Sequence, residues 1–146
     1  GSSTEESKSF HTQDGFGLRL LREAGISAGL ITARKSELVQ RRAAELKMDY
    51  IYQGISNKLN ALDKIIKKSG LKPFEIAYMG DDWLDLPILQ RIGFAVAPAN
   101  AAVEVREAVH YITEHTGGRG AVRDCCNIIL EAQNRIPDLL QKYKLK

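Results

Sequence analysis

The chain has 146 residues, of which 44% are hydrophobic, and a formal net charge of +3 at pH 7. This length suits one domain with a real core. A charge this small, without a basic block before the C-terminal tail, argues against a nucleic-acid binder and mildly favours anionic small molecules. No apolar run reaches membrane length and no secretory signal is present, so we expect no membrane partner. Cys125 and Cys126 lack metal-type spacing and are interpreted as reduced, partly buried thiols of a cytoplasmic protein.

Apolar runs alternate with helical patterns along the chain. Hydrophobic periodicity predicts helices over 16–24, 36–46, 59–68, 83–92, 103–108 and 121–134. Short apolar runs predict strands over 26–32, 50–53, 76–79, 94–96 and 111–112. Strands and helices that alternate with short loops are typical of a parallel, doubly wound sheet, so the predicted class is α/β. Residues 1–136 are expected to form the core, and residues 137–146 a basic tail that frays.

The acidic turn at the end of the 76–79 strand is the most informative stretch. Gly80 is followed by Asp81 and Asp82, and Asp85 comes soon after. Carboxylates at the carboxyl end of a strand lie where open α/β sheets bind ligands. Such clustered charges repel unless a cation neutralises them, and hard oxygen ligands suit Mg²⁺. A solvated helix N-terminus, where Asp is favoured in any case, explains the same residues about equally well.

Three other segments follow predicted strands and offer groups that could hold an anion. Thr32 and Arg34 leave the 26–32 strand, where a hydroxyl and backbone N–H groups can bind a phosphate oxygen. Lys58 opens the 59–68 helix, which is unfavourable for the helix dipole and suggests that it faces an anion. The loop 117–120 carries Arg119 between glycines that let a ligand approach the backbone. Each segment also has a plainer interpretation. Thr32 and Arg34 would be a β-branched strand end and a surface charge, Lys58 an ordinary residue at a helix start, and the loop 117–120 only a turn.

The order of these segments resembles the haloacid dehalogenase superfamily of phosphatases. More closely, the chain resembles the capless 3-deoxy-D-manno-octulosonate 8-phosphate phosphatase family, from about residue 5 to residue 134. The matching motifs are Gln13-Asp14-Gly15-Phe16-Gly17, Ile31-Thr32-Ala33-Arg34-Lys35, Tyr52-Gln53-Gly54, Ser56-Asn57-Lys58, Gly80-Asp81-Asp82 and Gly117-Gly118-Arg119-Gly120-Ala121-Val122-Arg123. The resemblance implies a three-layer, Rossmann-like core and a Mg²⁺-dependent hydrolysis of a sugar-acid phosphate.

The resemblance also implies a role for each matching position in the phosphoryl chemistry. Asp81 would ligate Mg²⁺, and Asp82 and Asp85 would support it and hold Lys58. Thr32 would donate a hydrogen bond to the phosphoryl group. Lys58 would neutralise the charge that develops on the phosphoryl oxygens.

Four further positions match substrate-binding positions of the family. Arg34 and Arg42 would contact the sugar acid, and Gly118 and Arg119 would lie near a subunit junction that completes the active site. The family assembles as a homotetramer, and a capless domain needs such a cover to exclude water. Octulosonate, neuraminate and other nonulosonate phosphates all present a carboxylate and a phosphate, so the sequence leaves the substrate open.

One departure from the family is large. The superfamily's nucleophile is the first Asp of an Asp-x-Asp motif on a central strand, and these 146 residues contain no Asp-x-Asp. We therefore expect a sheet without its middle strand, between the 26–32 and 76–79 strands. We also expect the chain by itself to be inactive, because no aspartyl-phosphate can form. A non-enzymatic assembly or binding module is the alternative. A two-component receiver fits less well, because its acidic pair comes early in the chain.

Overall fold

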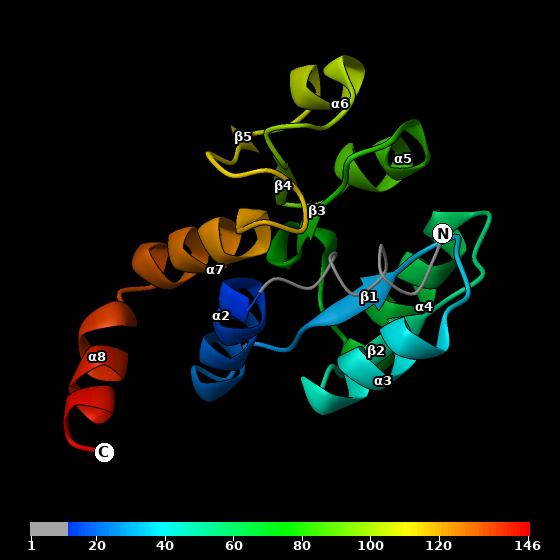
Figure 1. Ribbon diagram of the computed structural model, residues 1–146. Coiled ribbons are helices and arrows are strands. Elements are labelled where there is room, and N and C mark those ends of the chain that lie inside the picture. The colour runs from blue at the N-terminus through cyan, green and yellow to red at the C-terminus, as the bar shows by residue number, and fades with distance from the viewer. Residues whose placement is uncertain (1–11) are drawn as a thin grey trace.

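The structure is a computed structural model that describes residues 12–146, and it has the predicted parallel α/β architecture (Figure 1). The strands are β1 (Gly29–Ile31), β2 (Tyr50–Tyr52), β3 (Ala77–Met79), β4 (Phe94–Ala97) and β5 (Tyr111–Ile112). The α-helices are α2 (Thr12–Glu23), α3 (Glu37–Glu45), α4 (Lys58–Ser69), α5 (Leu86–Leu89), α6 (Val103–Glu107), α7 (Ala121–Ala132) and α8 (Ile136–Lys144). Two short 3-10 turns, η1 (Pro73–Glu75) and η2 (Trp83–Asp85), flank β3.

Local sequence signals account for the helices that follow β1 and β2. Ser36 is the N-cap of α3, and its hydroxyl accepts a hydrogen bond from the Val39 N–H at 3.2 Å. Asn57 caps α4 by accepting from the Leu59 N–H at 3.1 Å, so Lys58 becomes the first residue of that helix. Gly70 ends α4 in a left-handed conformation with a φ of 72°, which glycine adopts at little cost.

The described strands form two separate parallel sheets. β1 pairs with β2, and β3 pairs with β4, which in turn pairs with β5. Within residues 12–146, β1 and β3 therefore each have one edge without a strand partner. These are the two strands between which the sequence predicted a missing central strand, and the parallel pairing confirms the predicted class.

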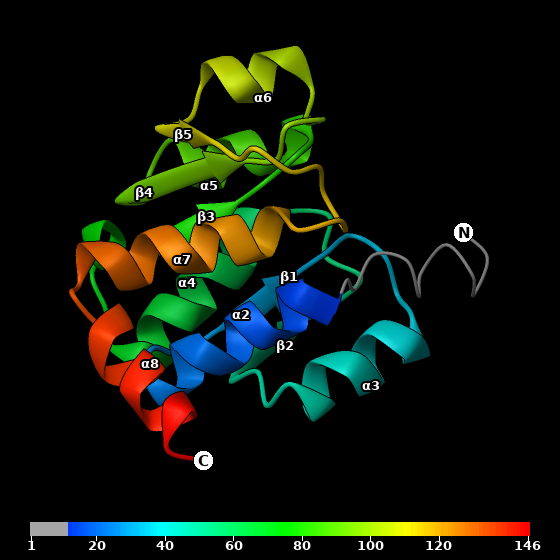
Figure 2. The same cartoon turned by 60° about the vertical axis from the view of Figure 1, so that its left-hand side comes forward.

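The core consists of two hydrophobic clusters, and the helices of the second, α2, α7 and α8, lie side by side in Figure 2. The first joins both sheets, because Ile31 of β1 packs with α4, α5, β4 and α6 through Leu62, Ile88, Ala95 and Val105. The second lies among three helices and consists of Leu20, Leu21, Ala24, Cys126, Leu130 and Leu139. The two sheets are thus held together by side-chain packing as well as by the chain itself.

The C-terminal segment differs from its prediction. Residues 137–146 were expected to fray, but most of them belong to α8, whose Leu139 is buried against α2 and α7. Ile136 and Tyr143 pack on the same cluster, since positions three and four residues apart share one helix face. No helix in the described part of the chain is long and apolar enough to cross a membrane.

Candidate active site

Asp85 is the centre of the acidic turn, and its side chain is almost completely buried, with the residue 2% exposed. One carboxylate oxygen, Oδ1, accepts hydrogen bonds from the Lys58 ammonium and the Tyr78 hydroxyl, each at 2.6 Å. The other, Oδ2, accepts from the backbone N–H groups of Asp81 at 3.0 Å and Asp82 at 3.2 Å. Asp85 therefore ties α4, β3 and the acidic turn together.

These contacts fix the charge of Asp85. Desolvation by burial would raise its pKa, but the hydrogen bonds from Lys58 and Tyr78 and the positive charge of Lys58 outweigh it and lower the pKa. Burial and the neighbouring carboxylate raise the pKa of Tyr78, so its hydroxyl stays protonated and donates. Asp85 is thus an ionised group whose oxygens are already used by protein donors, which leaves them poorly placed to bind a metal ion.

Gly80 allows this arrangement. A Cβ at Gly80 would lie 2.4 Å from the Cβ of Asp85, closer than real Cβ atoms approach. The sequence signal of a glycine before the acidic pair therefore has a steric cause. The sequence analysis did not predict a role for Tyr78. A tyrosine hydroxyl in the strand that leads to the acidic turn was the feature that could have indicated it.

Asp81 and Asp82 have different environments from Asp85. Asp82 caps η2, where its side chain accepts from the Trp83 N–H. Asp81 presents much of its side chain to solvent, yet partial desolvation and the charge of Asp85 raise its pKa. Asp81 is therefore the carboxylate of this turn that a cation would stabilise most.

The described residues supply an incomplete metal site. Within residues 12–146, no group of three or more His, Cys, Asp or Glu side chains could hold a metal ion. Asp81 fits as one carboxylate ligand, and phosphate and water oxygens are the other ligands that Mg²⁺ commonly accepts. Residues 12–146 therefore do not by themselves supply a complete set of protein ligands for a metal ion.

Thr32 and Arg34 lie at the end of β1, as predicted. The Thr32 hydroxyl accepts from the Arg34 N–H at 3.2 Å, which uses a lone pair and leaves the hydroxyl proton able to donate. Backbone hydrogen bonds from Ile55 to Thr32 and from Gly54 to Arg34 join this loop to the one after β2. The loops after β1 and β2 are therefore joined at one edge of the site.

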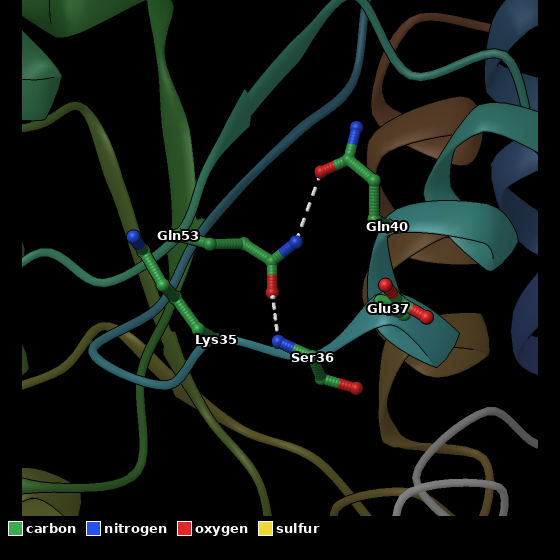
Figure 3. Close-up of a pocket in the computed structure, with 5 residues that line it drawn as sticks. All are labelled: Lys35, Ser36, Glu37, Gln40 and Gln53. Atoms are coloured by element: carbon green, nitrogen blue, oxygen red, sulfur yellow. Dashed lines mark hydrogen bonds between the residues drawn. The ribbon is translucent and has the colours of Figure 1, made fainter.

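An open pocket of about 410 Å³ lies on this edge (Figure 3). The Gln53 side chain accepts from the Ser36 N–H at 2.8 Å and donates to Gln40 Oε1 at 2.9 Å. Lys35 and Glu37 complete the wall. Sequence reasoning missed the bridging role of Gln53, whose signal was an amide directly after a strand.

Arg42 has a partner on its own helix. Its guanidinium lies 3.4 Å from Glu45 Oε2, and its Nη2 approaches Gly15 of α2 so closely that a Cβ there would be 2.7 Å away. Arg34 is exposed, and the convergence of both arginines on one ligand stays a prediction.

The geometry can be compared with known proteins. A sequence profile described as haloacid dehalogenase-like hydrolase matches residues 48–123. The 3-deoxy-D-manno-octulosonate 8-phosphate phosphatase of Escherichia coli K12 is 39% identical over 138 residues, which are 94% of this chain and 73% of that protein. The chain belongs to this phosphatase family within the haloacid dehalogenase-like hydrolases.

Solved structures agree with this family. The corresponding phosphatase from Yersinia pestis has a TM-score of 0.86 and 38% identity, covering 88% of this chain and 69% of that one. The enzyme from Moraxella catarrhalis, in complex with a magnesium ion, a phosphate ion and KDO, has a TM-score of 0.89 and 42% identity over 92% of this chain and 77% of that one. The resemblance read from the motifs is confirmed, and so are the fold and the hydrolase class.

Proposed function

We propose that the chain carries the phosphate- and substrate-binding part of a Mg²⁺-dependent phosphatase that hydrolyses a sugar-acid phosphate. The substrate would be 3-deoxy-D-manno-octulosonate 8-phosphate or a related nonulosonate phosphate. The observation that supports this best is the network around Asp85, which holds the Lys58 ammonium beside the acidic turn. A merely structural acidic turn has no need of a buried cation.

The residues divide the phosphoryl chemistry among them. Thr32 would donate its hydroxyl proton to a phosphoryl oxygen, and Lys58 would neutralise charge on the transferring group. Asp81 would hold Mg²⁺, which supplies electrostatic stabilisation of the phosphate when bound. Asp85 would keep Lys58 in place, and Asp82 would fix the turn by capping η2.

Recognition of the sugar acid is assigned to the arginines and the glycine-rich loop. Arg34 is exposed at the end of β1 and can meet a carboxylate with its planar fork. Arg42, Gly118 and Arg119 are further proposed contacts. The proposal is weakest for Arg42, because its guanidinium already contacts Glu45 and lies close to Gly15. Changing Arg34 to Ala should reduce turnover of the sugar-acid phosphate more than turnover of a generic phosphoester. Equal losses on both would mean that Arg34 is structural.

The reaction itself would use an aspartyl-phosphate formed on an Asp-x-Asp carboxylate, which these 146 residues do not contain. Asp82 and Asp85 do not replace it, because one caps η2 and the other is saturated with donors. We therefore expect the 146-residue chain to be inactive by itself.

A second candidate is a non-enzymatic assembly or binding module with a phosphatase-like fold. Retention of Thr32, Lys58 and Asp81 counts against this, because assembly alone does not require these three groups. The two candidates differ in what happens when a nucleophile is supplied.

The test is phosphate release from 3-deoxy-D-manno-octulosonate 8-phosphate with millimolar Mg²⁺. It compares the 146-residue chain with a version preceded by the Asp-x-Asp strand of the Escherichia coli relative. We expect no release from the former and release from the latter. The matched control carries Asn in place of the first Asp of that strand and should be inactive. Activity of the 146-residue chain alone, or inactivity of the extended version, would contradict the proposal.

Assembly and location complete the proposal. A homotetramer is proposed from the family resemblance, and the edges of β1 and β3 that have no strand partner within residues 12–146 favour self-association of this chain. Light scattering should give a mass well above the 16.2 kDa of one chain, and a monomer would contradict this. A cytoplasmic location is supported by two free, buried cysteines.

A further inference from the structure

A series of hydrogen bonds connects the acidic turn to the glycine-rich loop after β5. The Ala102 N–H donates to the carbonyl of Asp81 at 3.0 Å, which joins the loop after β4 to the acidic turn. From the same loop, the Asn100 side chain accepts from the Gly117 N–H at 2.8 Å. Since β3, β4 and β5 are parallel neighbours, these three loops lie side by side at one edge of the sheet.

The far end of the glycine-rich loop is anchored by Asp14 of α2. Asp14 is 3% exposed, and its two oxygens accept from the N–H groups of Arg123 at 3.0 Å and Gly120 at 3.3 Å. Gly120 has a φ of 115°, and a Cβ there would also approach the His115 ring to 3.1 Å. The loop 117–120 is therefore held at both ends, by Asn100 and by Asp14.

Asp14 also determines which part of the loop can meet a ligand. A helix N-terminus attracts anions through its free N–H groups and dipole. At α7 an internal carboxylate already occupies this position, so an external anion would compete with Asp14 for the same backbone donors. The group that the loop offers outward is the side chain of Arg119, which is exposed and has no ion pair among residues 12–146.

We propose that Asp14 is a positioning residue that fixes the glycine-rich loop so that Arg119 is presented to the anionic part of the substrate. The sugar-acid identity of that substrate rests on the proposed function. A loop anchored before binding loses less conformational freedom when a ligand arrives, so its cation binds more tightly. Asp14 acts through Arg119 and does not itself touch the ligand.

The experiment uses the 146-residue chain and four variants: Asp14→Asn, Asn100→Ala, Arg119→Ala and the double variant Asp14→Asn/Arg119→Ala. Asp14→Asn is nearly isosteric and keeps one acceptor. Asn100→Ala removes the hydrogen bond at the other, exposed end of the loop. It therefore tests the positioning of the loop without changing the buried Asp14. Asp138→Asn, at an exposed position in the first turn of α8, is the matched control. Amide hydrogen exchange at Gly120 and Arg123 measures the anchor, and NMR titrations with 3-deoxy-D-manno-octulosonate and with inorganic phosphate measure binding.

We expect Asp14→Asn to speed exchange at Gly120 and Arg123, while Asp138→Asn does not. Arg119→Ala should weaken binding about tenfold, as expected for loss of a charged hydrogen bond. Asp14→Asn and Asn100→Ala should each weaken it severalfold, and the double variant should bind about as weakly as Arg119→Ala alone.

The outcomes separate this inference from the proposed function. Additive losses in the double variant would overturn the positioning role, because Asp14 would then act independently of Arg119. Unchanged exchange at Gly120 and Arg123 would overturn the anchor. If the chain bound inorganic phosphate but not 3-deoxy-D-manno-octulosonate, only the sugar-acid assignment would be contradicted. The phosphate affinities of the four variants would then still decide the role of Asp14. Binding of neither probe would overturn the inference.

Discussion

Asp85→Asn is expected to be among the most damaging single changes in the site. The asparagine amide can accept at one position only, so it leaves either Lys58 and Tyr78 or the two backbone N–H groups of the turn without an acceptor. Two buried donors without partners cost about 1–3 kcal/mol each. Breaking a buried ion pair costs about 3–5 kcal/mol, and the Lys58 side chain is only 11% exposed. These estimates overlap, so we expect about 3–5 kcal/mol in total.

Thermal and urea unfolding at neutral pH measure this loss. For a chain of this length the expected fall in melting temperature is about 10–15 °C. Asp82→Asn is the matched control, because the same substitution three residues away alters an exposed cap that asparagine can also provide. It should change stability by less than about 1 kcal/mol. Equal melting temperatures for the two variants would refute the assignment of Asp85 as the buried organiser of the site.

Three further predictions concern other groups. The His115 ring donates a hydrogen bond to Asp124, and this bond and the negative charge of Asp124 raise the pKa of His115. This pair therefore stabilises the fold below the ordinary histidine pKa of about 6.5 and loses that contribution as pH rises through the raised value. An NMR titration should show the raised pKa, and Asp124→Asn should lower it; an unchanged value would disprove the pairing. Gly80→Ala should destabilise the chain strongly, because the new Cβ would lie 2.4 Å from the Cβ of Asp85. A melting temperature equal to that of the unchanged chain would contradict that packing. Burial raises the pKa of Cys125 to about 11 and of Cys126 to about 12, so a thiol reagent at neutral pH should label neither until the protein unfolds.

Periodicity in the sequence was enough to predict the helices and strands that carry the site. Ser36 as the cap of α3 and Lys58 at the start of α4 follow from short-range rules, because a cap involves residues two or three positions apart. The unpaired edges of β1 and β3 followed from the family resemblance combined with the missing motif.

Long-range contacts were beyond the sequence. The hydrogen bonds of Asp14 reach residues 106 and 109 positions away, and no local pattern marks that pairing. The close approach of Arg42 to Gly15 likewise depends on how α3 packs against α2, whereas its pair with Glu45 is a local contact within α3. The C-terminal helix was mistaken for a tail because three of the last five residues are lysines, although Ile136, Leu139 and Tyr143 already had helical spacing.

Asp81 and Asp85 show how the donors around a carboxylate decide its task. Asp85 has four donors and a lowered pKa, whereas Asp81 has no ion pair among residues 12–146 and a raised pKa. For an acid whose folded pKa is raised, the folded state holds its proton more tightly, so stability is lost as pH rises through the interval between the unfolded and folded values. At neutral pH the ionised Asp81 therefore opposes folding, and Asp81→Asn should raise the melting temperature above that of the unchanged chain. Mg²⁺ should also raise the melting temperature of the unchanged chain by mass action, but not that of Asp81→Asn. If neither Asp81→Asn nor millimolar Mg²⁺ changes the melting temperature, Asp81 is an ordinary surface carboxylate.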